Sequence, residues 1–190
     1  MSEPILEYLF DSPARVKLLK FFIHNWEEAF SLGQISERAQ VEPREARKEL
    51  ARLSAAGFVK ARRGRELIFQ TNTQFALLDE LKGLVTKSSP ASRERMLEKL
   101  RRLGRVKLVV LSGIFINADN AKADMLIVGD GISESRLTQF LRDLQAEVGK
   151  ELDYAMLSSE EFQYRYNMYD RFVRDLLERP HEKLINKLRL

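Results

Sequence analysis

The sequence predicts an α+β protein of two domains, and three observations lead to this class. Residues 12–87 read as several helices followed by a hairpin, residues 93–190 alternate apolar runs with amphipathic helices, and the polar stretch KSSPAS lies between them. A chain of 190 residues is long enough for two small domains. We therefore expect one domain at 1–87, a linker at 88–92 and a second domain at 93–190.

Composition narrows the class of protein. Apolar residues make up 44% of the chain and charged residues 32%, which is typical of a globular protein rather than a disordered one. The chain has no cysteine, which excludes disulfides and thiolate metal sites. The acidic start MSEPILEYLF is unlike a signal peptide, and no apolar run approaches the roughly 18–20 residues of a membrane helix. We expect a cytoplasmic protein with no membrane partner.

The first domain begins with three helices. Ser12 can cap the first of them, with Pro13 in its opening turn, and Ala29–Ser31 is a short extended piece. LGQISERA suits a second helix, and Pro43 opens a third that Gly57 ends. FVKARRGRELIFQTN alternates apolar and polar residues and predicts a hairpin, and TQFALLDELKGLVTK predicts a further helix.

The third helix has one apolar and one basic face. Helical spacing places Ala46, Leu50 and Leu53 on the face that packs on the preceding helix. From residue 44 to residue 65 the chain carries eight cations and two carboxylates, a larger surplus than the +4 of the whole chain. Such a patch favours a polyanion, and we expect double-stranded DNA. The predicted DNA-binding residues are Arg44, Arg47, Lys48, Arg52, Arg62, Arg63 and Arg65.

The stretch FSLGQISERAQVEPREARKELARLSAAGFVKARRGRELIFQTN resembles a winged helix-turn-helix domain of the bacterial and archaeal ArsR/MarR-like kind. The resemblance implies that 43–56 is the recognition helix, that 58–71 is the wing, and that a homodimer binds two-fold DNA. The alternative is a solvated charged face, in which Glu45 and Glu49 pair with neighbouring cations. His24 and His181 lie far apart in sequence, and we predict no metal site.

The second domain reads as three strands and several helices. The strands are VKLVVLSGIFI, ADMLIVGD and ELDYAML. The helix RERMLEKLRRLG precedes the first strand, and the helix SESRLTQFLRDLQAEVG lies between the second and the third. SSEEFQYRYNMYDRFVRDLLE predicts one long helix that a capping box of Ser158 and Glu161 begins and Pro180 ends, before a short tail helix. Its dense aromatic residues favour either an interface or the core, and they are Tyr164, Tyr166, Tyr169 and Phe172.

This order resembles the minimal nucleotidyltransferase domain of the DNA polymerase β superfamily, with a small mixed sheet. That family uses a Gly-Ser turn for the triphosphate and an Asp-x-Asp pair plus a third carboxylate for two Mg²⁺ ions. Gly113 matches the glycine, but Ile114 replaces the serine and Lys122 the first carboxylate. Asp124 matches the second carboxylate and Asp153 the third. We therefore predict a vestigial site with no catalytic residue and no cofactor.

Three functions stay open at this point. The leading hypothesis is a DNA-binding transcriptional regulator whose degenerate transferase-like domain serves dimerisation or ligand binding. The rivals are an active Mg²⁺-dependent nucleotidyltransferase targeted by its winged helix, in which Asp119 or Asp130 replaces the missing carboxylate, and an antitoxin-like module that binds a protein partner.

Overall fold

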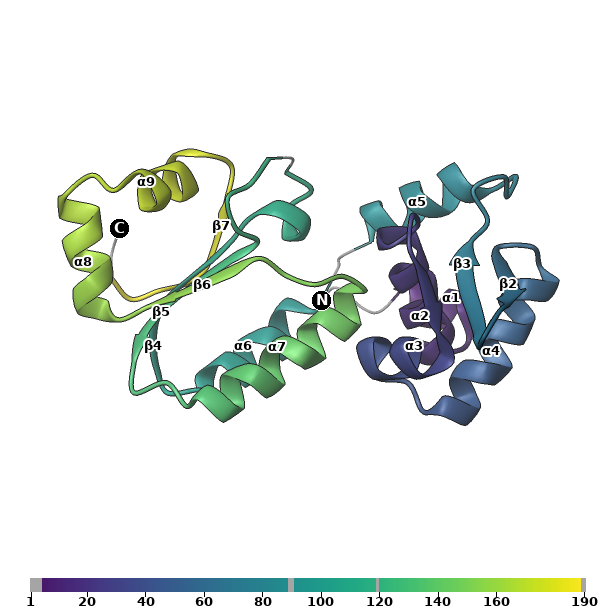
Figure 1. Ribbon diagram of the computed structural model, residues 1–190. Helices are drawn as coiled ribbons and strands as arrows, with labels where there is room; N and C mark the ends of the chain where they lie inside the picture. Colours follow the sequence, from purple (N-terminus) through teal and green to yellow (C-terminus); the bar gives the residue numbers. More distant parts are fainter. Residues whose placement is uncertain (1–4, 89–90, 119, 189–190) are drawn as a thin grey trace. The chain divides into compact units, whose positions relative to one another are not determined.

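The computed structural model describes residues 5–88, 91–118 and 120–188 and shows an α+β chain (Figure 1). Contacts divide the chain into two compact units. Unit 1 comprises residues 1–90 and 142–151, and unit 2 comprises residues 91–141 and 152–190. Residues 89 and 90 of the expected linker lie outside the described residues, and a domain boundary at 88–92 remains a prediction.

Unit 1 combines helices with a small antiparallel sheet in the strand order β1-β3-β2. Its elements are α1 (Ile5–Phe10), α2 (Pro13–His24), β1 (Ala29–Ser31), α3 (Leu32–Ala39), α4 (Pro43–Ala55), β2 (Val59–Arg63), β3 (Leu67–Thr71) and α5 (Leu78–Lys87). The Ser12 hydroxyl caps α2 by accepting a hydrogen bond from the Arg15 amide at 3.2 Å, as the sequence predicts.

The core of unit 1 forms where α2, α3 and α4 pack together. Phe21, Phe22, Ile35, Ala46 and Leu50 are almost fully buried. The helix expected over 73–87 begins only at Leu78, because a turn precedes it in which the Phe75 amide donates to the Asn72 carbonyl at 3.0 Å.

Unit 2 contains a four-stranded mixed sheet in the order β6-β5-β4-β7, in which β5 and β6 are parallel and the other pairs are antiparallel. Its elements are α6 (Arg93–Arg101), β4 (Arg105–Leu111), the 3₁₀ turn η1 (Gly113–Phe115), β5 (Met125–Asp130), the first part of α7 (Glu134–Val148), β6 (Tyr154–Leu157), α8 (Ser159–Asn167), α9 (Arg171–Glu178) and β7 (Glu182–Asn186). One face of this sheet packs on Phe162 of α8 and on Val173 and Leu176 of α9.

Three expectations for unit 2 are wrong. The strand expected over VKLVVLSGIFI stops at Leu111, because Gly113 has a positive φ of 48° and starts η1. The long aromatic helix is two helices, because Tyr169 has a φ of 54° and the Asp170 side chain caps a new helix. The tail is strand β7 rather than a helix, because it pairs with the edge of β4.

Candidate nucleic-acid interface and the turn at Asp124

Helix α4 has a buried apolar face and an exposed basic face. Ala46, Leu50 and Leu53 are at most 6% exposed and belong to the core that also contains Ile35 and Ala39 of α3, as helical spacing predicts. Pro43 occupies the first turn, and beyond the last turn Gly57 adopts a φ of 82°. On the opposite side of α4 the side chains of Arg44, Arg47 and Lys48 are exposed.

A basic hairpin follows α4 directly and packs against it. The Phe58 amide donates to the Leu53 carbonyl at 3.0 Å, and strand β2 contacts α4. Strands β2 and β3 pair from Val59↔Thr71 to Arg63↔Leu67, and residues 64–66 form the connecting loop. Four cations of this hairpin are exposed: Lys60, Arg62, Arg63 and Arg65.

The structure thus brings the seven expected DNA-binding residues onto two elements in contact, and all seven side chains are exposed. Among the described residues, Arg52 is the one member of this set whose guanidinium makes an ion pair. The other six are exposed cations that make no ion pair with a carboxylate of the described residues. This arrangement suits an extended anion, because exposed cations on adjoining elements add their fields.

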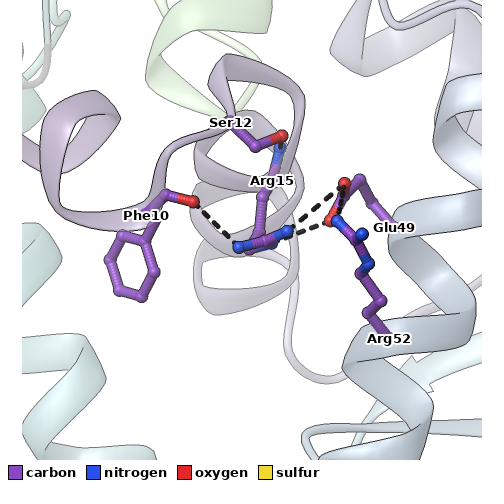
Figure 2. Close-up of polar contacts among 5 residues, drawn as sticks. All are labelled: Phe10, Ser12, Arg15, Glu49 and Arg52. Carbon is purple, nitrogen blue, oxygen red and sulfur yellow. Dashed lines mark hydrogen bonds and ion pairs between the residues drawn. The ribbon is translucent and has the colours of Figure 1, made fainter.

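Arg52 belongs to an ion cluster around a buried carboxylate on the flank of α4 (Figure 2). Its partner is Glu49, a carboxylate only 3% exposed. Arg15 of α2 donates to Glu49 through Nε at 2.8 Å and through Nη2 at 3.4 Å, and Arg52 Nη1 donates at 2.9 Å. Arg15 Nη1 also donates to the Phe10 carbonyl at 2.8 Å, so the cluster connects α4 to the start of α2.

The cations around Glu49 keep its carboxylate charged. Burial alone would raise the pKa of Glu49, but the hydrogen bond from Arg15 and the charges of Arg15, Arg52 and Lys48 outweigh it and hold the pKa below its ordinary value. The pairing of Glu49 with Arg52 at i,i+3 is the helical pairing that the sequence offers as an alternative. Arg15 has no such local signal, because 34 residues separate it from Glu49.

Asp124 of unit 2 is also buried, at 8% exposure, but its partners are backbone amides. Its Oδ1 accepts from the Ile114 amide at 2.9 Å and its Oδ2 accepts from the Asp153 amide at 3.0 Å. The Ser112 amide donates to the Asp124 carbonyl at 2.8 Å. Asp124 therefore joins η1 to the start of β6, and both of its oxygens already accept hydrogen bonds.

Gly113 fits this turn for a steric reason. Its φ of 48° favours glycine, and a Cβ at this position would collide with Asp124 Oδ1. Asp153 lies beside Asp124 across the β5–β6 pair, but its side chain is exposed, as is that of Lys122. The structure thus brings Gly113, Asp124 and Asp153 together, with Asp124 as the member whose side chain holds the turn.

Asp119 and Asp130 are the residues that could replace the missing carboxylate in the enzyme alternative. Asp130 is engaged in other contacts, and Asp119 lies outside the described residues. Asp130 ends β5 and accepts from the Ser159 amide at 3.0 Å, the Ser159 hydroxyl at 2.8 Å and Lys107 Nζ at 3.0 Å. The Ser159 amide, the Lys107 ammonium and the Ser159 hydroxyl hold the pKa of Asp130 well below its ordinary range. Asp119 is not among the described residues. Within the described part of the chain, no three His, Asp or Glu side chains are grouped as metal ligands would be.

Of the helices in the described ranges, none is both long enough and apolar enough to cross a membrane.

Three comparisons with known proteins gave no match. A scan against protein-family models found no match to the chain, and searches of curated proteins and of solved structures found none either.

Proposed function

We propose that this protein is a DNA-binding regulator in which α3 and α4 form a helix-turn-helix and β2 and β3 form the wing. The observation that carries the proposal is the exposure of eight basic side chains on α4 and the hairpin, seven of them without a carboxylate partner in the described residues. The apolar face of α4 is committed to the core, so its basic face is the one left for a ligand.

The chemistry of this surface suits a duplex. A helix fits the major groove, where guanidinium groups recognise the O6 and N7 atoms of guanine. In this proposal Arg44, Arg47 and Lys48 reach base edges or the flanking phosphates, and Arg62, Arg63 and Arg65 contact the backbone beside the groove. The cluster at Glu49 fixes the rotation of α4, because it ties the helix to Arg15.

A three-way salt titration tests the proposal. We compare the wild-type chain, an α4–hairpin variant and a control variant by fluorescence anisotropy with a labelled random-sequence duplex. The α4–hairpin variant is Arg44→Gln, Arg47→Gln, Arg62→Gln and Arg63→Gln. The control removes the same charge from α8, α9 and the following turn, and it is Arg165→Gln, Arg171→Gln, Arg174→Gln and Arg179→Gln.

We expect the α4–hairpin variant to reduce the slope of log K against log salt by about one for each lost phosphate contact. The control should retain the wild-type slope, because three of its four arginines already pair with Glu161, Asp175 and Glu178. Equal slopes for the two variants would contradict the proposal. Selection of bound duplexes from a random pool would then show whether the surface prefers a sequence.

We further propose that unit 2 does not catalyse nucleotidyl transfer. Two Mg²⁺ ions need a cluster of free carboxylate oxygens, whereas both oxygens of Asp124 accept backbone hydrogen bonds and the expected first carboxylate is Lys122. Incubation with labelled ATP, Mg²⁺ and duplex should leave no labelled product. Label transfer that Asp153→Asn abolishes would establish the enzyme alternative instead.

A homodimer is part of the same proposal. Exposed apolar side chains occur beside and on α5, at Leu77 and Leu84, and on and after α8, at Tyr164 and Tyr169. Such residues are enriched in interfaces, and two-fold DNA sites are bound by dimers. Sedimentation velocity at micromolar concentration should give a dimer. A monomer there would contradict this part, and a stoichiometric second protein after purification from the native source would favour the interaction-module alternative.

A further inference from the structure

Two turns of unit 2 are fastened to each other at one end of the sheet. The turn at 102–104 joins α6 to β4, and the turn at 131–133 joins β5 to α7 (Figure 1). The Ser133 amide donates to the Leu103 carbonyl at 3.0 Å. Gly104 approaches the second turn so closely that an added Cβ would lie 2.5 Å from the Gly131 carbonyl oxygen. The backbone at this end is therefore fixed by direct contact.

Four exposed arginines lie in these turns or in the helices and the strand that adjoin them, and we call them the arginine turn surface: Arg101, Arg102, Arg105 and Arg136. Arg136 Nη1 donates to the Arg102 carbonyl at 2.9 Å, which holds the residues of the two turns close together. Segments 101–107 and 130–136 together contain five cations and two carboxylates. These two short segments therefore carry a net positive charge, and a backbone hydrogen bond joins them.

The arginine turn surface differs from five other cations of unit 2, which pair with carboxylates: Arg93, Lys107, Arg165, Arg171 and Arg174. Arg93 pairs with Glu182 at 2.9 Å, and Arg165 pairs with Glu161 at 2.7 Å. Among the described residues, none of the four guanidinium groups of the surface makes an ion pair with a carboxylate.

The carboxylate nearest in the sheet register is already engaged. Asp130 is the partner of Arg105 across β4 and β5, but its two oxygens accept from Ser159 and Lys107. The carboxylate opposite Arg105 is therefore engaged by Ser159 and Lys107, and within the described ranges no other carboxylate forms an ion pair with the surface.

We propose that the arginine turn surface is a second phosphate-binding surface, which grips the backbone of the DNA that the chain binds. Four exposed guanidinium groups with no carboxylate partner among the described residues suit phosphates, because a planar fork can donate two parallel hydrogen bonds to phosphate oxygens. The inference rests on the proposed function, since α4 and the hairpin identify nucleic acid as the polyanion. It adds to that function a role for unit 2 in affinity rather than in sequence reading.

The positions of exposed apolar side chains favour nucleic acid over an anionic membrane. A membrane-binding surface combines cations with apolar side chains that enter the lipid. In the described part of unit 2, the large exposed apolar residues lie on β6, on α8 and on the turn after α8, and none lies on the two arginine turns.

The test adds one variant to the salt titration, again in the chain with both units. The turn variant is Arg101→Gln, Arg102→Gln, Arg105→Gln and Arg136→Gln, and the α8–α9 control removes the same net charge. We expect the turn variant to lower the salt slope by two to four, at about one per phosphate contact, while the control keeps the wild-type slope. Sequence preference in a selection experiment should not change.

The outcomes separate this inference from the proposed function. If the α4–hairpin variant loses slope and the turn variant matches the control, the proposed function stands and the second surface is overturned. If the turn variant alone loses slope, the second surface stands and the recognition role of α4 fails. Wild-type protein that does not bind duplex at low salt overturns both. Arginine-dependent sedimentation with phosphatidylserine vesicles, without an effect on duplex binding, would assign the surface to a membrane and overturn the inference.

Discussion

Each unit contains a buried carboxylate, and the two carboxylates have opposite kinds of partner. Glu49 in unit 1 accepts hydrogen bonds from the guanidinium groups of Arg15 and Arg52, whereas Asp124 in unit 2 accepts from the backbone amides of Ile114 and Asp153. A carboxylate held by side-chain cations fixes where those cations point. A carboxylate held by backbone amides fixes a turn, and it needs neither a cation nor a metal to be satisfied.

This difference bears on what each unit does. In unit 1 the ion cluster ties α4 to α2 and leaves the remaining cations of α4 at the surface. In unit 2 Asp124, which the sequence analysis compares with a transferase carboxylate, accepts a hydrogen bond that closes the η1 turn. Position in the sequence alone does not reveal this role, because a metal ligand and a turn-closing aspartate are the same residue type.

The largest effect should come from Asp124→Ala. The substitution leaves two inward-facing amides, those of Ile114 and Asp153, without their acceptor. We expect a loss of about 3 kcal/mol in the free energy of unfolding, since each unsatisfied amide costs about 1 to 3 kcal/mol. Urea denaturation measures this loss, with Asp153→Ala as the exposed control expected to change stability by less than about 0.5 kcal/mol. Equal effects of the two variants would show that the carboxylate of Asp124 does not hold the turn.

The matching change in unit 1, Glu49→Gln, should cost about 2 kcal/mol. It removes the charge that the Arg15 guanidinium pairs with, and Arg15 is only 25% exposed, so solvent compensates the loss in part. The same denaturation experiment measures it. Glu45→Gln, which changes an exposed carboxylate in the first turn of α4, serves as the control and should have little effect. A stability equal to that of the wild type would mean that the cluster does not fasten α4.

Mild acid should destabilise unit 1 more than unit 2. Burial, together with the charges of Lys150 and Lys20, lowers the pKa of His24 from 6.5 to about 4. Because the folded state disfavours the protonated form, His24 contributes full stability above pH 6.5, and that stability is lost as the pH falls from 6.5 toward 4. We expect unit 1 to lose about 1.5 kcal/mol between pH 7 and pH 5.

Hydrogen exchange resolved along the chain measures this loss, because it reports opening of unit 1 and unit 2 separately. His24→Gln should flatten the response of unit 1. Unit 2 should keep its protection over this range, since the lowered pKa of Asp130 delays the loss of its contribution until the pH falls below the ordinary aspartate value. Equal loss of protection in both units, or an unchanged response in His24→Gln, would contradict this prediction.

The parts of the fold that depend on neighbours in sequence could be predicted. The buried face of α4, the cap at Ser12 and the β2–β3 hairpin follow from helical spacing, a capping residue and alternation. The tail strand β7 could not, because its conformation is set by pairing with β4, whose residues lie more than seventy positions earlier. The break between α8 and α9 was missed because the aromatic spacing continues through it, although Asp170 is a typical capping residue.

The residues of the candidate interface that are close in sequence could also be predicted. The basic residues of α4 and the hairpin were found because they all lie in one short segment, residues 44–65. Sequence reasoning did not find Arg15, since nothing near Arg15 in the sequence indicates that Glu49 is its partner. It also did not find the arginine turn surface, whose members Arg102 and Arg136 come together only through the contact between two turns.

The smallest effect on stability, and the sharpest test of the comparison, is Arg52→Gln. Arg52 is 52% exposed, and Glu49 keeps its two hydrogen bonds from Arg15, so we expect a loss of no more than about 0.5 kcal/mol. The informative quantity is duplex binding. A guanidinium already engaged by Glu49 is less available to phosphate than that of Arg47, which has no carboxylate partner among the described residues.

Arg52→Gln should therefore lower the salt slope by clearly less than Arg47→Gln, although the two substitutions remove the same charge from the same helix. Fluorescence anisotropy across a salt series measures both. If the slopes fall equally, Arg52 leaves Glu49 when DNA binds, and Glu49 is then a temporary partner that phosphate displaces. If only Arg47→Gln lowers the slope, the ion cluster is a fixed part of unit 1, and the basic face begins beyond it.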